Sequence, residues 1–435
     1  MSTILRRSKA RSRGGADTRR DAMSRLRLAI RQAMGVQARR RDRVRRDALR
    51  RAGRDPRAVW EVITDMLLRF GGASSGNAIT FFCNGDEIFD AIWQAIDGAK
   101  RRVWYEMYTI EPDRVGRRTM EALTAAAQRG CQVRLLYDAV GSPRLGENLL
   151  KPLRDAGAQI DCFNPILQWK RPQSLLTRDH RKIIIIDNHT AFVGGCNTSE
   201  DYCGPRYGNG LFQDCEVRLE GPCVRDLADL VLGSMRLVRQ VEKRDTLPRC
   251  GRKGETFVQA LGSHGVHGKR AIQRAVRLTV RHAVQRCWIT TPYFLPPRRL
   301  MRAMIRSAER GVDVRLLTAG VSDVPIARAA AQHIYGQFLR HGVRIFEMFD
   351  VTLHAKTMVI DGLYSTVGSF NLDQFSDKRN LEVNVGMIDP EVARTLEEDF
   401  ERNLSQAREV TLDNWSRRTR WQRCVHWLAY QLTRL

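Results

Sequence analysis

The sequence predicts an α/β protein of two similar domains with mixed, largely parallel sheets, packed with pseudo-two-fold symmetry. Three observations predict this fold. Strand and helix patterns alternate along most of the chain, which is typical of parallel α/β units. The segment AAAQRGCQVRLL at Ala125 to Leu136 returns as RSAERGVDVRLL at Arg306 to Leu317, which indicates an internal duplication. Each half also carries one copy of the spacing H-x-K-x4-D, and halves that each contribute half a site are expected to pack face to face.

Composition bounds the class of protein. The 435 residues are enough for two domains with separate cores, and 43% hydrophobic residues fits a globular protein. The formal net charge of +25 predicts an anionic partner, which is nucleic acid, an anionic lipid surface or a phosphate-bearing substrate. The 10 cysteines include no C-x-x-C pair and no zinc-like spacing, so we expect reduced thiols, no metal site and no cofactor.

We expect residues 1–77 to form a basic N-terminal extension that is partly disordered or amphipathic. Arginine dominates it, and apolar residues such as Met23 and Leu26 recur near helical spacing. This pattern favours a helix lying on anionic lipid, while a disordered basic tail explains the composition equally well. The run from Gly71 to Gly76 is typical of a linker, so ordered structure is expected to begin near Ala78.

The first domain is expected over residues 78–250. A helix pattern around Trp93 comes first, followed by a strand over Arg102 to Ile110. A second helix ends at Gly130, and a strand over Val133 to Tyr137 follows it. The order strand, helix, strand implies a parallel pair.

The second domain, expected over residues 251–409, repeats this order. Helices are predicted over Ile272 to Ala283 and over Arg302 to Arg310. Strands are predicted over Trp288 to Thr290 and over Val314 to Leu317. The two halves therefore align element by element.

Residues 410–435 are expected to form an amphipathic C-terminal helix. Its apolar positions recur at helical spacing among arginines, at Trp421, Val425, Leu428 and Leu432. Tryptophan and arginine together suit a helix in the lipid headgroup region, and a helix that caps the second domain is the alternative. No apolar run reaches the roughly 18 residues that cross a bilayer.

The candidate catalytic residues come from the two motif copies. They are His180, Lys182 and Asp187 in the first half, and His354, Lys356 and Asp361 in the second. Because alternate side chains of a strand share a face, the histidine and lysine of each copy point the same way. Two strands with a buried histidine would not explain two copies of the whole pattern. We interpret the two aspartates as structural residues that hold the turn after each motif strand.

Small and amide residues follow each motif at the same interval and are the candidate phosphate-binding residues. They are Gly195 and Asn197 in the first half, and Ser369 and Asn371 in the second. Small residues let the backbone approach an anion, and an asparagine amide donates to a phosphoryl oxygen. Lysines would neutralise a phosphodiester, one imidazole would attack it, and the other would protonate the departing alkoxide.

Both copies resemble the HKD motif of the phospholipase D superfamily. Three segments are similar in sequence to bacterial cardiolipin synthases, to the B-type most of all: DHRKIIIIDNHTAFVGGCN, QDCEVRLEGP and LHAKTMVIDGLYSTVGSFNLDQFS. The resemblance runs from about residue 78 to the C-terminus. It implies two phospholipase D-like α/β sandwich domains and a ping-pong reaction through a covalent phosphatidyl-histidine. It further implies that His180 is the nucleophile and His354 the acid and base, although the motifs themselves do not distinguish the two.

The resemblance also implies a carboxylate that orients each histidine. In the second half Glu382 stands where the family places the partner of the motif histidine, and Asp214 is its first-half counterpart. Glu216 is the alternative to Asp214, because EVR at Glu216 aligns with EVN at Glu382. The role of Glu106, which aligns with Thr290, is open and includes a hydrogen bond to a polar headgroup.

The expected function is that of a cardiolipin synthase, which moves a phosphatidyl group from one phosphatidylglycerol to another and releases glycerol. The alternatives are a phospholipase D, a transferase that uses phosphatidylethanolamine and, less favoured, a nuclease. The expected partners are anionic phospholipids, phosphatidylglycerol in particular, and the membrane surface, with no nucleic acid as a physiological partner. The expected location is the cytoplasmic side of the bacterial cell membrane, as a peripheral protein.

Overall fold

The computed structural model describes residues 48–49, 51–53, 55–165, 177–239, 246–263, 270–373, 376 and 380–433. The chain divides into two compact units, Met1–Arg69 and Phe70–Leu435. In the first unit the described residues include helix α3 (Pro56–Leu67). The helix expected around Met23 and Leu26 lies outside the described residues.

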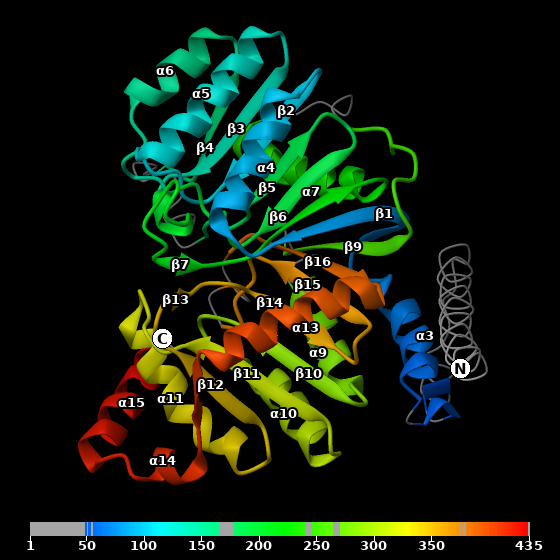
Figure 1. Cartoon of the computed structure of the whole chain (residues 1–435), viewed down its shortest axis with the longest axis vertical. Helices are drawn as coiled ribbons and strands as arrows, with labels where there is room; N and C mark the ends of the chain where they lie inside the picture. The colour runs from blue at the N-terminus through cyan, green and yellow to red at the C-terminus, as the bar shows by residue number, and fades with distance from the viewer. Residues whose placement is uncertain are drawn as a thin grey trace, which may run out of the picture. The chain divides into compact units, whose positions relative to one another are not determined.

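The second unit contains both halves of the duplication (Figure 1). Its first half comprises β1 (Gly72–Phe82), α4 (Gly85–Asp97), β2 (Arg102–Met107), α5 (Arg114–Gln128), β3 (Gln132–Asp138), α6 (Glu147–Asp155), β4 (Gln159–Phe163), β5 (Ile183–Ile186), β6 (Thr190–Gly194), β7 (Phe212–Gln213), β8 (Glu216–Glu220) and α7 (Cys223–Val238). The strand expected over Arg102 to Ile110 is β2, which ends at Met107.

The second half repeats most of this series and adds strand β17 and two C-terminal helices. It comprises β9 (Thr256–Ser263), α9 (Ala271–His282), β10 (Arg286–Thr290), α10 (Arg298–Glu309), β11 (Asp313–Ala319), α11 (Pro325–Leu339), β12 (Arg344–Met348), β13 (Thr352–Leu353), β14 (Thr357–Ile360), β15 (Tyr364–Gly368), β16 (Glu382–Ile388), α13 (Pro390–Ser405), β17 (Ala407–Val410), α14 (Leu412–Ser416) and α15 (Arg420–Leu432).

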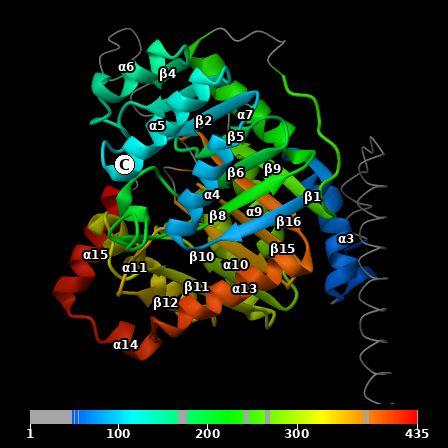
Figure 2. The same cartoon turned by 45° about the horizontal axis from the view of Figure 1, so that its top comes forward.

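The strand order confirms the pseudo-two-fold symmetry. The large sheet has the order β17-β12-β11-β10-β14-β15-β16-β9-β1-β8-β6-β5-β2-β3-β4. The series from β9 through β16 to β12 matches, strand by strand, the series from β1 through β8 to β4. The symmetry axis therefore passes between β1 and β9, which lie side by side at the centre of the sheet (Figure 2).

The sheet is mixed, as expected, but its parallel share is smaller than expected. Within it, parallel pairing is confined to β2–β3–β4 and to β10–β11–β12. The motif strands β5 and β14 pair antiparallel with both of their neighbours. The chain returns from each motif strand through a hairpin, and a hairpin makes an antiparallel pair.

Most of the linker expected from Gly71 to Gly76 is instead part of strand β1, which begins at Gly72. Its residues Gly72–Ser74 pair with β9, and Ala78–Phe82 pair with β8, so one strand joins both halves of the sheet. A Cβ atom on Gly72 would lie 2.7 Å from the Asp226 carboxylate. The small residues here allow close packing rather than flexibility, and sequence composition does not separate these two uses of glycine.

Both faces of the first-half sheet are covered. The four isoleucines of β5 are all buried, with Ile183 and Ile185 in the core that includes α7. Ile184 and Ile186 face the second core, built from α4, α5 and α6. A strand that is buried on both faces reads as a continuous apolar run. This burial fixes the strand that follows the first motif histidine.

Candidate active site

The backbone N–H and the Nδ1 atom of His180, which lies three residues before the start of β5, are hydrogen-bonded to the other half of the molecule. Its backbone N–H donates to the carbonyl oxygen of Leu381 at 3.0 Å. In the next residue, Glu382, the carboxylate oxygen Oε2 lies 3.0 Å from Nδ1 of His180. The His180 side chain is 13% exposed and the Glu382 side chain is fully buried. Burial lowers the pKa of His180, and Glu382 opposes this shift.

His354, directly before β14, has the symmetric arrangement. Strand β13 pairs with β7, and the backbone N–H of His354 donates to the carbonyl oxygen of Gln213 at 2.8 Å. The following residue, Asp214, places Oδ2 2.6 Å from Nδ1 of His354. Burial raises the pKa of Asp214, but Lys356 and His354 outweigh it and hold the pKa below its ordinary value.

The two histidine–carboxylate pairs therefore cross between the halves, which corrects our expectation. We expected Glu382 to partner His354, and Asp214 to partner His180, each within its own half. The physical reason for the crossing is backbone pairing. Each histidine is hydrogen-bonded to the segment of the other half that directly precedes the carboxylate.

Strand register decides between Asp214 and Glu216. Gly194 lies opposite Glu216, and the equivalent Gly368 lies opposite Asn384. Glu216 is thus equivalent to Asn384, and Asp214, two residues earlier, is equivalent to Glu382. Burial raises the pKa of Glu216 well above its ordinary value, and the nearby Asp214 adds to this shift. Glu216 is a buried carboxyl in β8 that makes no described contact with either histidine.

The two motif lysines are buried beside the histidines. Lys182 Nζ donates to the backbone carbonyl of His180 at 3.0 Å. Lys356 Nζ donates to the backbone carbonyl of His354 and lies 3.9 Å from Asp214 Oδ2. Burial and the charge of Lys356 lower the pKa of Lys182 to about 7. Burial also lowers the pKa of Lys356. Two close, desolvated ammonium groups favour an anion between them.

The candidate phosphate-binding residues lie in the same region but are not equivalent. Asn197 Nδ2 donates to the Tyr202 hydroxyl at 2.7 Å, whereas the buried Oδ1 of Asn371 has no hydrogen-bond partner among the described residues. Ser369 Oγ donates to Glu382 Oε2. At the equivalent Gly195, a Cβ atom would lie 2.3 Å from Asp214 Oδ1, so only glycine leaves room for this carboxylate.

The structure does not bring Asp187 or Asp361 into contact with the motif histidines His180 and His354. The Asp187 carboxylate accepts from the backbone N–H groups of Lys100, Arg101 and Arg102, at 2.8 to 3.3 Å. Asp361 does the same with the equivalent residues 284–286, at 2.7 to 3.1 Å. Both have a left-handed backbone, with φ of +52° and +56°. These carboxylates hold the segment that enters β2 or β10, rather than the turn after the motif.

Burial also decides the surroundings of two charged residues near the site. Glu106 does not face a headgroup, because it is fully buried and its carboxylate accepts from Ser234 Oγ at 2.6 Å. Arg178, two residues before His180, is buried as well, and its guanidinium lies 3.4 Å from the Asp138 carboxylate.

Sequence reasoning missed the aromatic residues around the histidines. The rings of Tyr108 and His180 pack edge to face, with their centroids 4.8 Å apart. The centroid of the Tyr108 ring also lies 5.1 Å from Lys182 Nζ. The rings of Tyr202 and Phe212 pack against the His354 ring, with centroid distances of 5.3 and 5.5 Å. One signal was present, since Tyr108 directly follows β2, which pairs in parallel with β3, and the ends of such strands commonly face the site.

One cavity of about 670 Å³ joins these groups. Both histidines and both asparagines line it, together with Tyr108, Tyr202 and Phe212. Residues of α11 and Leu432 of α15 line it as well. Two imidazoles, each with Nδ1 tied to a carboxylate, thus share one chamber beside two lysines, which is an arrangement suited to two proton-coupled steps at one phosphate.

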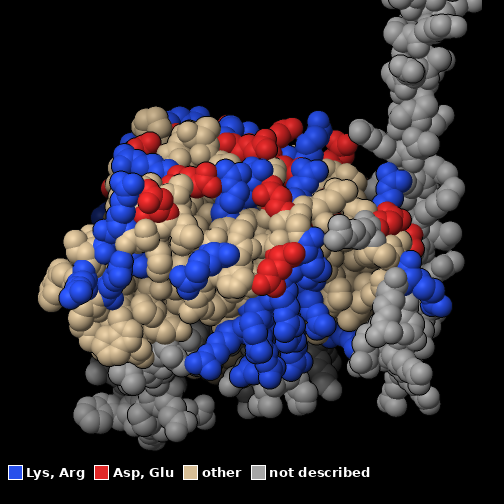
Figure 3. Space-filling view, turned by 90° about the horizontal axis from the view of Figure 1, so that it is seen from below, with Lys and Arg blue, Asp and Glu red and all other residues tan. Residues whose placement is uncertain are grey.

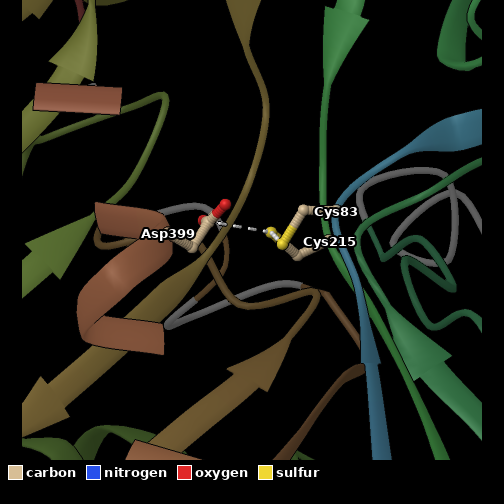
Figure 4. Close-up of side chains that lie close together, drawn as sticks. All are labelled: Cys83, Cys215 and Asp399. Atoms are coloured by element: carbon tan, nitrogen blue, oxygen red, sulfur yellow. Dashed lines mark hydrogen bonds between the residues drawn. The ribbon is translucent and has the colours of Figure 1, made fainter. Parts of the chain in front are cut away.

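The described residues hold one group of side chains that could bind a cation, formed by Cys83, Cys215 and Asp399 (Figure 4). The two sulfur atoms lie 3.4 Å apart, and Cys215 Sγ lies 3.9 Å from Asp399 Oδ2. Asp399 already accepts from Arg402 and Asn403. Contact with Cys83, followed by burial, raises the pKa of Cys215 well above its ordinary value, which favours thiols over metal-binding thiolates.

Comparisons with known proteins agree with this architecture. A family model described as "Cardiolipin synthase, PLD-like domain" matches residues 92–214 and again residues 277–404. The chain is 32% identical to cardiolipin synthase B of Escherichia coli K12 over 370 residues, which cover 82% of this chain and 88% of that protein. It is 28% identical to cardiolipin synthase 1 of Bacillus cereus over 371 residues, covering 82% of this chain and 72% of that protein.

Solved structures show the same fold. The chain superposes on phosphatidylserine synthase from Haemophilus influenzae with a TM-score of 0.64, at 15% identity, over 86% of this chain and 96% of that one. Within the described residues, no helix combines the length and apolarity needed to cross a membrane. The family match covers both halves, so the duplication inferred from the repeated motif is also a duplication of the family's domain.

Proposed function

This chain belongs to the cardiolipin synthase family of the phospholipase D superfamily, a family of phosphatidyltransferases, and we propose that it transfers a phosphatidyl group from one phosphatidylglycerol to another. The products are cardiolipin, which is the lipid product, and free glycerol. The observation that carries the proposal is the pair of crossed contacts, His180 with Glu382 and His354 with Asp214, on one cavity.

These contacts prepare the Nε2 atoms for reaction. A carboxylate that accepts from Nδ1–H fixes the tautomer in which Nε2 carries the lone pair. In the first step, Nε2 of His180 attacks phosphorus and the bond from phosphorus to the glycerol oxygen breaks. The proton on Nε2 of His354 goes to that oxygen, so glycerol leaves as a neutral alcohol and a phosphatidyl group remains on His180.

Protonation of His354 is coupled to substrate binding. Burial and Lys356 lower the pKa of His354 to about 4, which disfavours the imidazolium in the free enzyme. A bound phosphodiester brings a negative charge beside the lysines and shifts this pKa upward. Lys182 and Lys356 neutralise the phosphoryl oxygens, and the Nδ2 group of Asn371 is a further donor.

The second step reverses the roles with a new alcohol. Nε2 of His354, now neutral, takes the proton from the free glycerol hydroxyl of a second phosphatidylglycerol. The hydroxyl oxygen attacks phosphorus, and the bond to His180 breaks. Water in place of this lipid would give phosphatidic acid, so the enzyme must act where lipid outcompetes water. We therefore place it on the membrane surface as a peripheral protein, on the cytoplasmic side of a bacterial cell.

The test is turnover of labelled phosphatidylglycerol in vesicles by the purified full chain, beside His180→Ala and His354→Ala. Cardiolipin and glycerol in equal amounts, lost in both variants, are expected. Rapid quenching of the wild-type enzyme during turnover should also trap a phosphatidyl adduct on His180, which mass spectrometry locates. Phosphatidic acid as the main product would make the chain a hydrolase, and an adduct on His354 instead of His180 would exchange the two roles.

A further inference from the structure

The C-terminal helix α15 exposes its apolar face. It packs on α11, where the ring of Tyr430 lies 4.9 Å from that of His333, and its buried residue is Ala429. A different face carries four apolar residues at helical spacing, which we call the apolar ridge. They are Trp421, Val425, Leu428 and Leu432, and their exposed fractions are 74%, 36%, 47% and 58%. A helix whose only role was to cap the domain would bury this face.

The apolar ridge leads into the cavity that holds the histidines. Leu432 is its last residue and also lines that cavity. Val324 and Ile326, at the start of α11, line the same cavity and are 38% and 45% exposed. Apolar side chains therefore continue from the surface of α15 to the chamber where the reaction is proposed. Exposed apolar surface beside a cavity marks a contact site for lipid or protein.

A second exposed feature of the same domain is basic. The helices α9 and α10, which pack against each other, carry a group of arginines that we call the arginine patch. It consists of Arg274, Arg277, Arg281, Arg298, Arg299, Arg302 and Arg306. None of them makes an ion pair with a carboxylate among the described residues. Figure 3, seen from the end where α10 lies, shows basic side chains gathered in one dense group.

The arginines of the patch crowd one another. Burial lowers the pKa of Arg277, and the charges of Arg299, Arg281 and Arg274 lower it further. Unpaired like charges on packed helices repel each other, and an anionic partner relieves the repulsion. A guanidinium group can donate two parallel hydrogen bonds to one phosphate, so a surface that carries phosphate groups is a suitable partner for this patch.

We propose that an anionic phospholipid bilayer docks on the apolar ridge, with the arginine patch supplying long-range attraction. The proposal rests on the proposed function, because the substrate lies in that bilayer. Aromatic and aliphatic side chains of the ridge enter the headgroup region, and the cavity mouth then opens to lipid rather than to water. Docking here would favour transfer over hydrolysis.

The test of the ridge uses the full chain with Trp421→Glu and Leu428→Glu together. Leu237→Glu and Val238→Glu together, which place the same two negative charges on exposed apolar residues of α7 (53% and 36% exposed), are the matched control. Cosedimentation with phosphatidylglycerol vesicles should weaken about tenfold or more in the double variant and stay unchanged in the control. The double variant should turn over a short-chain phosphatidylglycerol, supplied below its critical micelle concentration, at the same rate as the wild type.

Unchanged vesicle binding by the double variant would overturn the docking surface. Loss of turnover on the dissolved short-chain lipid would overturn it too, because the ridge would then act on the site itself. Failure of the proposed function looks different. In that case the wild-type chain binds vesicles through the ridge, yet neither vesicles nor dissolved lipid is turned over.

The arginine patch is tested with Arg274→Gln, Arg277→Gln and Arg281→Gln combined. The control is Arg154→Gln, whose guanidinium pairs with Glu147 in the first half. The triple variant should lose most of the salt dependence of binding to anionic vesicles, whereas the control should keep it. Unaltered vesicle binding together with lost affinity for RNA would assign the patch to nucleic acid and overturn its place in lipid docking.

Discussion

His180 of the first half is oriented by Glu382 of the second, with Nδ1 and Oε2 3.0 Å apart. The reciprocal contact joins His354 to Asp214. Among the described residues, neither motif histidine is oriented by a carboxylate of its own half, so a single copy of the domain would lack these oriented imidazoles. This dependence gives the duplication a physical reason beyond the supply of two histidines.

The crossing makes a residue-specific prediction for the positioning residues. We expect Glu382→Gln to lower the pKa of His180 further, because Glu382 opposes the effect of burial, and to leave the titration of His354 nearly unchanged. Asp214→Asn should act on His354 in the same way. Each substitution should lower kcat by roughly 10²- to 10⁴-fold, the range that acid–base catalysis contributes.

Histidine-selective ¹⁵N NMR titration of the two variants distinguishes the pairs. The control is Glu220→Gln, which changes a carboxylate at the far end of β8. If Glu382→Gln perturbed His354 and spared His180, each carboxylate would belong to the histidine of its own half after all.

Asp187 is expected to matter for stability rather than for chemistry. Asp187→Asn keeps a side chain that tolerates the left-handed backbone but weakens the contacts with three backbone N–H groups. The free energy of unfolding should fall by about 1–3 kcal/mol, the cost of losing charged hydrogen bonds. The kcat of the remaining folded enzyme should change little.

Urea denaturation and turnover at saturating substrate measure the two effects separately. Asp413→Asn, at an exposed position of α14, serves as the control and should leave stability within about 0.5 kcal/mol. A collapse of kcat with unchanged stability would return Asp187 to the group of residues that take part in the reaction.

Local patterns predicted the parts of the site that repeat in the sequence. The fixed spacing of His180, Lys182 and Asn197 identified these residues as candidate site residues, because the same spacing recurs in the second half. The duplication gave the symmetry, because two copies of one unit must bury equivalent faces. Periodicity placed two helices and the parallel pair of strands in each half, although ends such as that of β2 shifted by a few residues. It did not predict the long helices α7, α11 and α13.

Long-range contacts were beyond such patterns. The crossing follows from backbone pairing between Leu381 and the Arg178–His180 segment, which are about two hundred residues apart and share no sequence signal. The Gly71 to Gly76 run was misread because close packing on Asp226 and flexibility select the same small residues. The position of Glu106 was also unpredictable, since its partner Ser234 lies on a distant helix.

Activity is expected to be independent of divalent cations. Lys182 and Lys356 supply the positive charge that a metal ion would otherwise bring to the phosphate. Extended dialysis against EDTA should leave turnover unchanged, and so should Cys83→Ser, which alters the candidate cation group found among the described residues. Stoichiometric zinc in the purified protein, lost together with activity on dialysis, would contradict this expectation.

Lys182 should set opposite pH trends for activity and stability. Its pKa of about 7, against an ordinary value of 10.5, means that it loses its proton as the pH rises through 7. We therefore expect kcat/KM to fall on the alkaline side of about pH 7, since neutral Lys182 no longer offsets the phosphate charge. Between pH 7 and 10.5 the unfolded chain binds more protons than the folded one, so the free energy of unfolding should rise with pH.

Both trends are measured on one preparation, with kcat/KM profiles and urea denaturation at pH 7 and pH 9. Lys182→Arg stays charged throughout this range, so the alkaline decline in kcat/KM should disappear. Lys182→Met carries no charge, so the contribution of this residue to the rise in stability should vanish. A decline that persists in Lys182→Arg would mean that another group, such as Lys356, titrates in this window. The low pKa of Lys182 would then not be what limits the reaction at high pH.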